Sequence, residues 1–149
     1  MNPVLAEGVQ AASPKDFQTL LAVWEASVRA THHFITEDDI ALFKTLVRDQ
    51  ALPALSLYCM RDAHQKAIGF IGVDQAKIEM LFIDPSWRGK KIGRQLVAYA
   101  VKELGVTQVD VNEQNEQAVG FYQKMGFKII GRSAVDGTGK PYPLLHMQL

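Results

Sequence analysis

The segment IDPSWRGKKIGRQLVAYAVKEL, residues 83–104, is the part of the sequence from which the fold is inferred. Its apolar beginning ends at Asp84–Pro85, and six of the seven residues in 88–94 are glycine, lysine or arginine. Apolar residues then recur at helical spacing, which predicts an amphipathic helix over about 91–104. Glycines and cations are therefore concentrated where a helix begins.

Such a junction is suited to hold an anion. The first backbone N–H groups of a helix have no partner within it, and the helix dipole makes that end positive. Gly89 lets the loop amides approach a ligand, Gly93 leaves room beside the first turn, and Arg88 and Arg94 add forked donors. The segment matches neither GxxxxGK[ST] nor GxGxxG. It predicts a pyrophosphate site, the alternative being a solvated basic turn.

The composition is that of an ordinary globular domain, and we expect one domain over residues 1–149. Apolar residues make up 48%, charged residues 21%, and the formal net charge is zero, which gives no electrostatic case for nucleic acid or an anionic membrane. The single cysteine, Cys59, excludes an internal disulfide and is expected to be inert packing. With neither a signal-peptide pattern nor a membrane-spanning apolar run, the sequence predicts a cytoplasmic protein.

Apolar periodicity and turn residues predict a mixed α+β fold. Short polar segments separate three apolar runs in the middle of the chain, which therefore form antiparallel strands. Strand 77–83, helix 91–104 and strand 107–112 make a crossover, so these two strands are expected to be parallel. The prediction is a largely antiparallel seven-stranded sheet with one parallel pair and about four helices. The expected strands are 4–12, 55–60, 66–73, 77–83, 107–112, 127–135 and 142–149, and the expected helices are 14–30, a second from Thr36 until Pro53 ends the region, 91–104 and 115–125.

A second motif, NEQAVGFYQKMGF, covers residues 115–127. Asn115 is placed to cap a short helix, and Gly126 to close it in the left-handed conformation so that Phe127 packs back. Together with RGKKIG at 88–93, this motif resembles the GCN5-related N-acetyltransferase (GNAT) family, whose later signature is Asn-x-x-Ala-x-x-x-Tyr-x-x-x-Gly-Phe. Element order is similar over essentially the whole chain. The C-terminal third and the segment SVRATHHFIT also resemble the small bacterial YjaB-type members.

The resemblance implies that acetyl-CoA is the acyl donor and that its pyrophosphate binds the 88–94 amides. The family's loop signature, Arg/Gln-x-x-Gly-x-Gly/Ala, occurs here with Lys91 in place of the first glycine. In the family the pantetheine pairs with the splayed end of the preceding strand, so backbone at 81–83 is implied to position the thioester carbonyl. The residues implied to bind the cofactor are Leu81, Phe82, Ile83, Arg88, Gly89, Lys90, Lys91, Ile92, Gly93, Arg94, Asn115, Ala118, Phe121 and Tyr122.

Two residues are candidates for proton transfer. The resemblance implies that Tyr122 stabilises or protonates the leaving thiolate, and the alternative is an aromatic residue in an apolar helix stripe. Glu79 is an unexpected carboxylate in an apolar strand, and burial beside the acceptor would suit it to take the proton of the attacking amine. The alternative is that strand alternation turns Glu79 to solvent. A histidine or a water molecule is a further candidate for the base.

The acceptor side is predicted from fewer signals. His32 and His33 lie in a break between two predicted helices, from which they can reach a substrate groove; the alternative is one capping histidine and one exposed histidine. Tyr142 is a candidate to line the acceptor site or an ordinary strand aromatic. The spacing of cysteine and histidine residues fits no metal site.

The sequence therefore predicts an acetyl-CoA-dependent N-acetyltransferase that acts on a primary amine, small-molecule or protein, by direct attack in a ternary complex. The alternative is a non-catalytic acyl-CoA-binding protein or sensor with the same fold, an alternative that Lys91 keeps open. Nucleic acid is not an expected partner, because no aromatic stacking platform accompanies the loop cations. A monomer and a homodimer are both compatible with the sequence.

Overall fold

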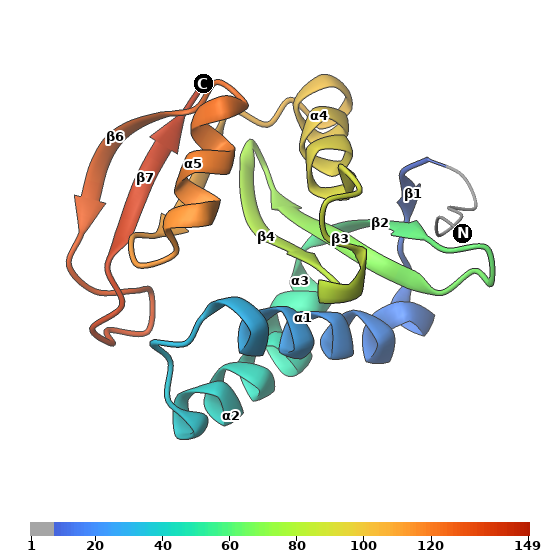
Figure 1. Cartoon of the computed structure of the whole chain (residues 1–149), viewed down its shortest axis with the longest axis horizontal. Helices are drawn as coiled ribbons and strands as arrows, with labels where there is room; N and C mark the ends of the chain where they lie inside the picture. The colour runs from blue at the N-terminus through green and yellow to red at the C-terminus, as the bar shows by residue number, and fades with distance from the viewer. Residues whose placement is uncertain (1–7) are drawn as a thin grey trace.

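The computed structural model describes residues 8–149, and Figure 1 shows one curved sheet flanked by helices. The strands are β1 (Gln10–Ala11), β2 (Ser56–Arg61), β3 (Ala67–Asp74), β4 (Lys77–Ile83), β5 (Gln108–Asn112), β6 (Lys128–Ser133) and β7 (Leu144–Gln148). The longer helices are α1 (Phe17–Thr31), α2 (Glu37–Leu46), α4 (Ile92–Leu104) and α5 (Glu116–Lys124). Shorter turns are the 3-10 helices Pro14–Asp16 and Pro85–Trp87, the π-helix Val47–Ala51 and α3 (Leu52–Ala54).

The seven strands form one sheet in the order β1-β2-β3-β4-β5-β7-β6. Of the strand pairs, β4 with β5 is parallel and the others are antiparallel. The crossover through α4 produces that parallel pair, as the strand–helix–strand pattern predicted. The mixed α+β fold and its largely antiparallel seven-stranded sheet are confirmed.

Several element bounds differ from the prediction, and two of them concern the N-terminal half. The strand expected over 4–12 is limited to Gln10–Ala11 among the described residues, and its first four positions lie outside them. Pro53 was expected to end the second helical region, and the helical residues end one position later, at Ala54, after which Leu55 is extended. Proline has no N–H to donate to the preceding turn, so a helix that ends here loses little.

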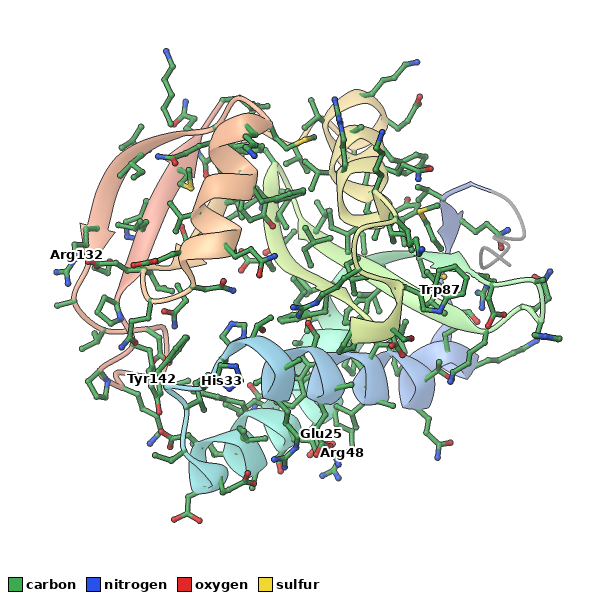
Figure 2. All side chains as sticks on the ribbon, in the orientation of Figure 1. Glu25, His33, Arg48, Trp87, Arg132 and Tyr142 are labelled. Atoms are coloured by element: carbon green, nitrogen blue, oxygen red, sulfur yellow. The ribbon has the colours of Figure 1, made fainter. Side chains whose placement is uncertain are left out.

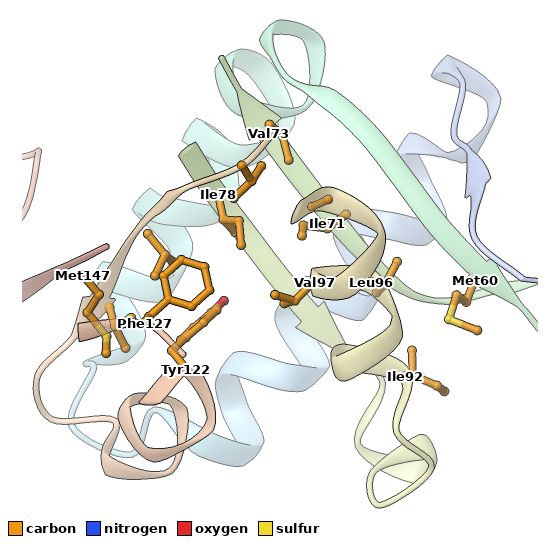
Figure 3. Packing of buried hydrophobic residues seen from close by; sticks show 14 of the residues in the cluster. Met60, Ile71, Val73, Ile78, Ile92, Leu96, Val97, Tyr122, Phe127 and Met147 are labelled. Carbon is orange, nitrogen blue, oxygen red and sulfur yellow. The ribbon is translucent and has the colours of Figure 1, made fainter. Parts of the chain in front are cut away.

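Each face of the sheet carries its own apolar core. On the α4–α5 face, Ile92, Leu96 and Val97 pack with strand residues and with Tyr122 and Phe127 of the α5 region (Figure 3). On the opposite face, the core residues of α1 and α2 pack against β2, β3 and β4. Within residues 8–149 no helix has the length and apolar character needed to cross a membrane.

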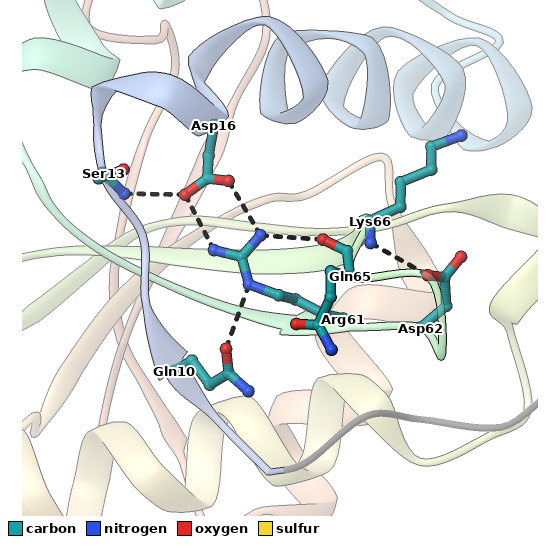
Figure 4. Close-up of polar contacts among 7 residues, drawn as sticks. All are labelled: Gln10, Ser13, Asp16, Arg61, Asp62, Gln65 and Lys66. Carbon is teal, nitrogen blue, oxygen red and sulfur yellow. Dashed lines mark hydrogen bonds and ion pairs between the residues drawn. The ribbon is translucent and has the colours of Figure 1, made fainter.

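The N-terminal edge of the sheet is held by Arg61 at the end of β2 (Figure 4). Its guanidinium donates to both carboxylate oxygens of Asp16, at 2.9 and 3.0 Å, and to the side chain of Gln10 at 3.2 Å. The hydrogen bond from Arg61 lowers the pKa of Asp16 against the opposing effect of burial. These contacts fix β1 and the start of α1 to the β2–β3 hairpin.

Candidate active site

A β-bulge in β4 opens the sheet. Opposite β3, Gly72 faces Met80 and Val73 faces Ile78, so Glu79 is an extra residue with no partner in the ladder. On the other side, β4 pairs with β5 over only two positions, Lys77 with Gln108 and Ile78 with Val109. Bulges bend a strand and end pairing. Beyond the bulge, β4 therefore diverges from β5.

A cavity of about 540 Å³ lies at this divergence. Its wall includes β4 residues 78–83 and β5 residues 109–112, together with side chains from helices on both faces of the sheet. Ser27, Thr31 and His32 come from the C-terminal end of α1, whereas Ala118, Phe121 and Tyr122 come from α5. Two molecules entering from opposite faces can therefore meet between the separated strands.

The loop before α4 forms one end of the cavity. Gly89 and Lys91 both adopt the left-handed conformation, with φ of 75° and 62°. Lys91 is the N-cap of α4 and makes no capping hydrogen bond with its side chain. The first N–H groups of α4 are thus available to an anion. A Cβ atom at Gly93 would lie 3.6 Å from the ring of Phe121, an ordinary van der Waals contact, so the first turn of α4 lies close to α5.

Most residues predicted to bind the cofactor line this cavity. The exception is Lys90, which is not part of the wall among the described residues. The residues of that prediction found in the wall are Leu81, Phe82, Ile83, Arg88, Gly89, Lys91, Ile92, Gly93, Arg94, Asn115, Ala118, Phe121 and Tyr122. The predicted anion loop and the 115–127 motif are therefore brought to one place.

The 115–127 motif builds the α5 wall. The side chain of Asn115 accepts a hydrogen bond from the N–H of Ala118 at 3.2 Å, which confirms it as the N-cap. Gly126 has a φ of 102°, and this left-handed turn lets Phe127 enter the core, where it is 2% exposed. Phe127 lies edge-on to Tyr122, with ring centroids 5.6 Å apart (Figure 3).

Tyr122 is both a core aromatic residue and part of the cavity wall. Burial raises the pKa of its phenol, which therefore keeps its proton at neutral pH. Within residues 8–149 its hydroxyl has no hydrogen-bond partner, and it is not sealed from the cavity either. The hydroxyl is thus an available donor.

Glu79 lies in the cavity wall, but it is not buried. Its side chain is 37% exposed, and its carboxylate is 3.6 Å from the ammonium of Lys77. The bulge explains this exposure, because an unpaired residue in a bend projects from the ladder. The burial on which its role as base was predicted is therefore absent.

A chain of polar contacts near Glu79 was not predicted from the sequence. The Lys77 ammonium lies 2.6 Å from Asp110, whose other oxygen is 2.7 Å from Nδ1 of His146. Nε2 of His146 is in turn 2.7 Å from the hydroxyl of Ser133. Burial opposes the charge on Asp110, but the hydrogen bonds from Lys77 and His146 prevail, and its pKa is lowered. Four strands supply these residues, so no short motif could reveal them.

The three acceptor-side candidates separate in the structure. His32 lines the cavity. His33, in the turn after α1, and Tyr142 are not among the wall residues (Figure 2). Tyr142 is 7% exposed and donates a hydrogen bond to Asp39 at the start of α2. This bond and the neighbouring rings of Phe34 and Phe43 hold Tyr142, a residue of the β6–β7 loop, against α2 and the segment before it.

The remaining reactive groups lie elsewhere. Cys59 is completely buried, and burial raises the pKa of its thiol. Over the part of the chain that the structure describes, no three histidine, cysteine or acidic side chains are grouped to hold a metal ion.

Comparison with known proteins identifies similar sequences. A family model described as the acetyltransferase (GNAT) domain matches residues 28–144. Peptidyl-lysine N-acetyltransferase YjaB of Salmonella typhimurium is 45% identical over 130 residues, which covers 87% of this chain and 89% of that protein. The protein of the same name from Escherichia coli is 44% identical over 130 residues, covering 87% and 88%.

Solved structures are similar over nearly the whole chain. The solution structure of apo YjaB from Escherichia coli has a TM-score of 0.87 and 40% identity, and the match covers 95% of each chain. The PaiA N-acetyltransferase of Thermoplasma acidophilum, solved in complex with coenzyme A, has a TM-score of 0.73 and 23% identity, covering 95% of this chain and 98% of that one. The second likeness shows a shared fold.

Proposed function

The chain belongs to the acetyltransferase (GNAT) family and is an N-acetyltransferase; from that premise we propose that it transfers the acetyl group of acetyl-CoA to the side-chain amine of a lysine in a peptide or protein. The observation that carries this proposal is the cavity between the separated strands β4 and β5. It joins an uncapped helix N-terminus on one side to polar side chains on the other. Peptidyl-lysine is the acceptor in the names of the YjaB relatives.

The residues at 88–94 fit the pyrophosphate of such a donor. Two left-handed residues turn the loop, the first α4 amides lack partners within the helix, and Arg88 and Arg94 bring positive charge to the same wall. The bound donor would supply the activated acetyl group as a thioester. The diverging backbone of β4 at 80–83 offers hydrogen-bonding groups freed from the ladder, which support an extended pantetheine there.

Tyr122 and the acceptor side complete the proposed reaction. The neutral phenol of Tyr122 donates a hydrogen bond, and then a proton, to the sulfur that leaves when the amine attacks directly. The carboxylates of Glu79 and Asp110 line the same cavity and favour the approach of a cationic lysine side chain. Glu79, acting through a water molecule, and a histidine in the same wall are the two candidates for the base. The setting we propose is cytoplasmic, with residues 1–149 acting as one domain in a monomer or homodimer.

The test is acetyl transfer by the purified chain to a panel of amines. The panel contains a lysine peptide with a blocked N-terminus, a lysine-free peptide with a free N-terminus, and a polyamine. Thiol release and the mass of the acceptor are read together. We expect release and mass gain with the lysine peptide. Transfer only to another amine would change the acceptor, and acetyl-CoA binding without transfer to any amine would favour the non-catalytic alternative.

A further inference from the structure

The C-terminal end of α1 carries a directed chain of hydrogen bonds that faces the cavity. The hydroxyl of Thr31 lies 2.7 Å from the backbone carbonyl oxygen of Ser27, one helical turn earlier. The same hydroxyl oxygen lies 2.7 Å from Nδ1 of His32. The three residues all belong to the cavity wall.

This chain determines which nitrogen of His32 bears the proton. A carbonyl oxygen only accepts, so the single hydroxyl proton of Thr31 is directed to Ser27. The hydroxyl oxygen can then only accept from His32, which places the imidazole proton on Nδ1. Nε2 is left with its lone pair. The ring itself is held by Phe34, whose centroid is 5.3 Å away.

The lone pair on Nε2 is open to the cavity. Among residues 8–149 it has no hydrogen-bond partner, yet no unsatisfied nitrogen or oxygen is sealed inside the protein. Burial first, and then the electrostatic influence of Arg88 and His33, lowers the pKa of His32 to about 4, so the ring is neutral near pH 7. The cavity wall also includes the carboxylates of Glu79 and Asp110.

His32 lies on the side from which the acceptor would arrive. α1 covers one face of the sheet, and α4 with its preceding loop lies on the other face (Figure 1). A donor held at the α4 loop therefore leaves the α1 side of the cavity for the amine. Tyr122 contacts the cavity from α5, on the donor's face.

We propose that His32 is a catalytic residue whose Nε2 accepts a proton from the attacking amine, with Thr31 and Ser27 as positioning residues that fix its tautomer. As the C–N bond forms, the amine N–H proton passes to Nε2. The C–S bond breaks, and its electron pair stays on sulfur, which takes a proton from Tyr122. The imidazolium then releases its proton to solvent, and Tyr122 regains one. This inference rests on the proposed function and names the base at the same site.

The tautomer is tested without any substrate. In a long-range ¹H–¹⁵N spectrum of the ¹⁵N-labelled protein near pH 7, we expect Nδ1 of His32 to be protonated and Nε2 to be unprotonated. Thr31→Val should remove this preference, and Thr31→Ser should keep it. A protonated Nε2 in the wild type would overturn the assignment, since the cavity would then face a donor.

Kinetics with the lysine peptide test the catalytic role. We expect His32→Gln to lower kcat by about 100-fold or more while the KM for acetyl-CoA changes by less than about threefold. Thr31→Val should lower kcat by about tenfold, and Thr31→Ser should restore it. His64→Gln, in the exposed β2–β3 turn, is the matched control and should retain wild-type activity.

The outcomes separate the two proposals. Suppose that the wild type acetylates the peptide and that the His32→Gln variant folds. If the kcat of the variant is then within about threefold of the wild-type kcat, the role of His32 is overturned and the proposed function stands. A wild type that transfers no acetyl group to any amine would overturn the proposed function itself. If His32→Gln raises only the KM for acetyl-CoA, His32 contributes to donor binding, and its role as base is overturned.

Discussion

The two sides of the cavity are built differently. The donor side is dominated by one continuous segment, the turn at 85–94 and the start of α4, whose glycines, cations and helix N-terminus are neighbours in the sequence. The acceptor side is assembled from the end of α1, the bulge in β4, and β5, segments separated by tens of residues. The first can be interpreted from local chemistry alone, whereas the second exists only after the sheet has formed.

The same difference appears in the charged groups. On the donor side the cations at 88 and 94 have no ion pair among residues 8–149, so they are available to an external anion. On the acceptor side Lys77, Asp110 and His146 satisfy one another. Cations without an ion-pair partner indicate a strongly charged ligand on the donor side. The paired groups on the acceptor side indicate a preorganised wall, whose charge depends on several strands at once.

Tyr122→Phe tests the point where the two sides meet and carries the largest expected effect. We expect kcat for acetyl transfer to fall by about 100-fold or more, because the leaving sulfur loses its proton donor. The free energy of unfolding should change by less than about 0.5 kcal/mol, since the hydroxyl has no partner in the described chain. Steady-state kinetics and urea unfolding check both. Tyr99→Phe, on α4 outside the cavity wall, is the control, and equal activity of the two variants would contradict the role.

His32, on the acceptor side, should make the free energy of unfolding depend on pH between about pH 4 and pH 6.5. Its pKa is about 4 when folded and 6.5 in the unfolded chain, so the unfolded chain binds more protons between these values. Stability is therefore fully present above pH 6.5 and declines as pH falls toward 4, by about 2 kcal/mol between pH 7 and pH 5. Urea unfolding at the two pH values measures this loss.

His32→Gln should remove most of that loss, and His64→Gln in the exposed turn should not. The stability that Asp16 and Asp110 contribute through their lowered pKa values is present above their unfolded value of 3.8 and is lost as pH falls below it, outside this window. If the His32→Gln variant loses as much stability between pH 7 and pH 5 as the wild type does, the buried, neutral state of this ring is absent in solution.

Local patterns predicted much of the fold and of the donor side. The cap at Asn115, the left-handed turn at Gly126 and the parallel crossover strands each depend on a few neighbouring residues or on chain connectivity. The bulge at Glu79 depends instead on how β4 registers against β3, and the sequence alternation alone predicted no such shift. The hydrogen bond from Tyr142 to Asp39 joins positions 103 residues apart, beyond any local pattern.

Arg88→Gln tests whether the donor side binds an anion. We expect the Kd for coenzyme A to rise by about tenfold, because a charge-assisted hydrogen bond to phosphate is lost. The salt dependence of binding should also weaken. Calorimetric titration at two salt concentrations measures both quantities. Lys102→Gln, an exposed cation at the other end of α4, removes the same charge away from the cavity and should leave Kd within about twofold. Equal losses in both variants would show a general charge effect.

Lys91 carries the smallest expected effect and tests the donor loop itself. It adopts φ 62° and ψ 23°, a conformation that costs a non-glycine residue about 1 kcal/mol, and glycine avoids that strain. Lys91→Ala removes the side chain but keeps the strain, so the Lys91→Gly variant should be more stable than Lys91→Ala by about 0.5–1 kcal/mol in urea unfolding. Both variants retain the amide at 91, and their Kd for coenzyme A should stay within about threefold of wild type. Equal stability of the two would mean that the loop relaxes in solution, whereas a large loss of affinity in both would assign the anion to the lysine ammonium rather than to the backbone.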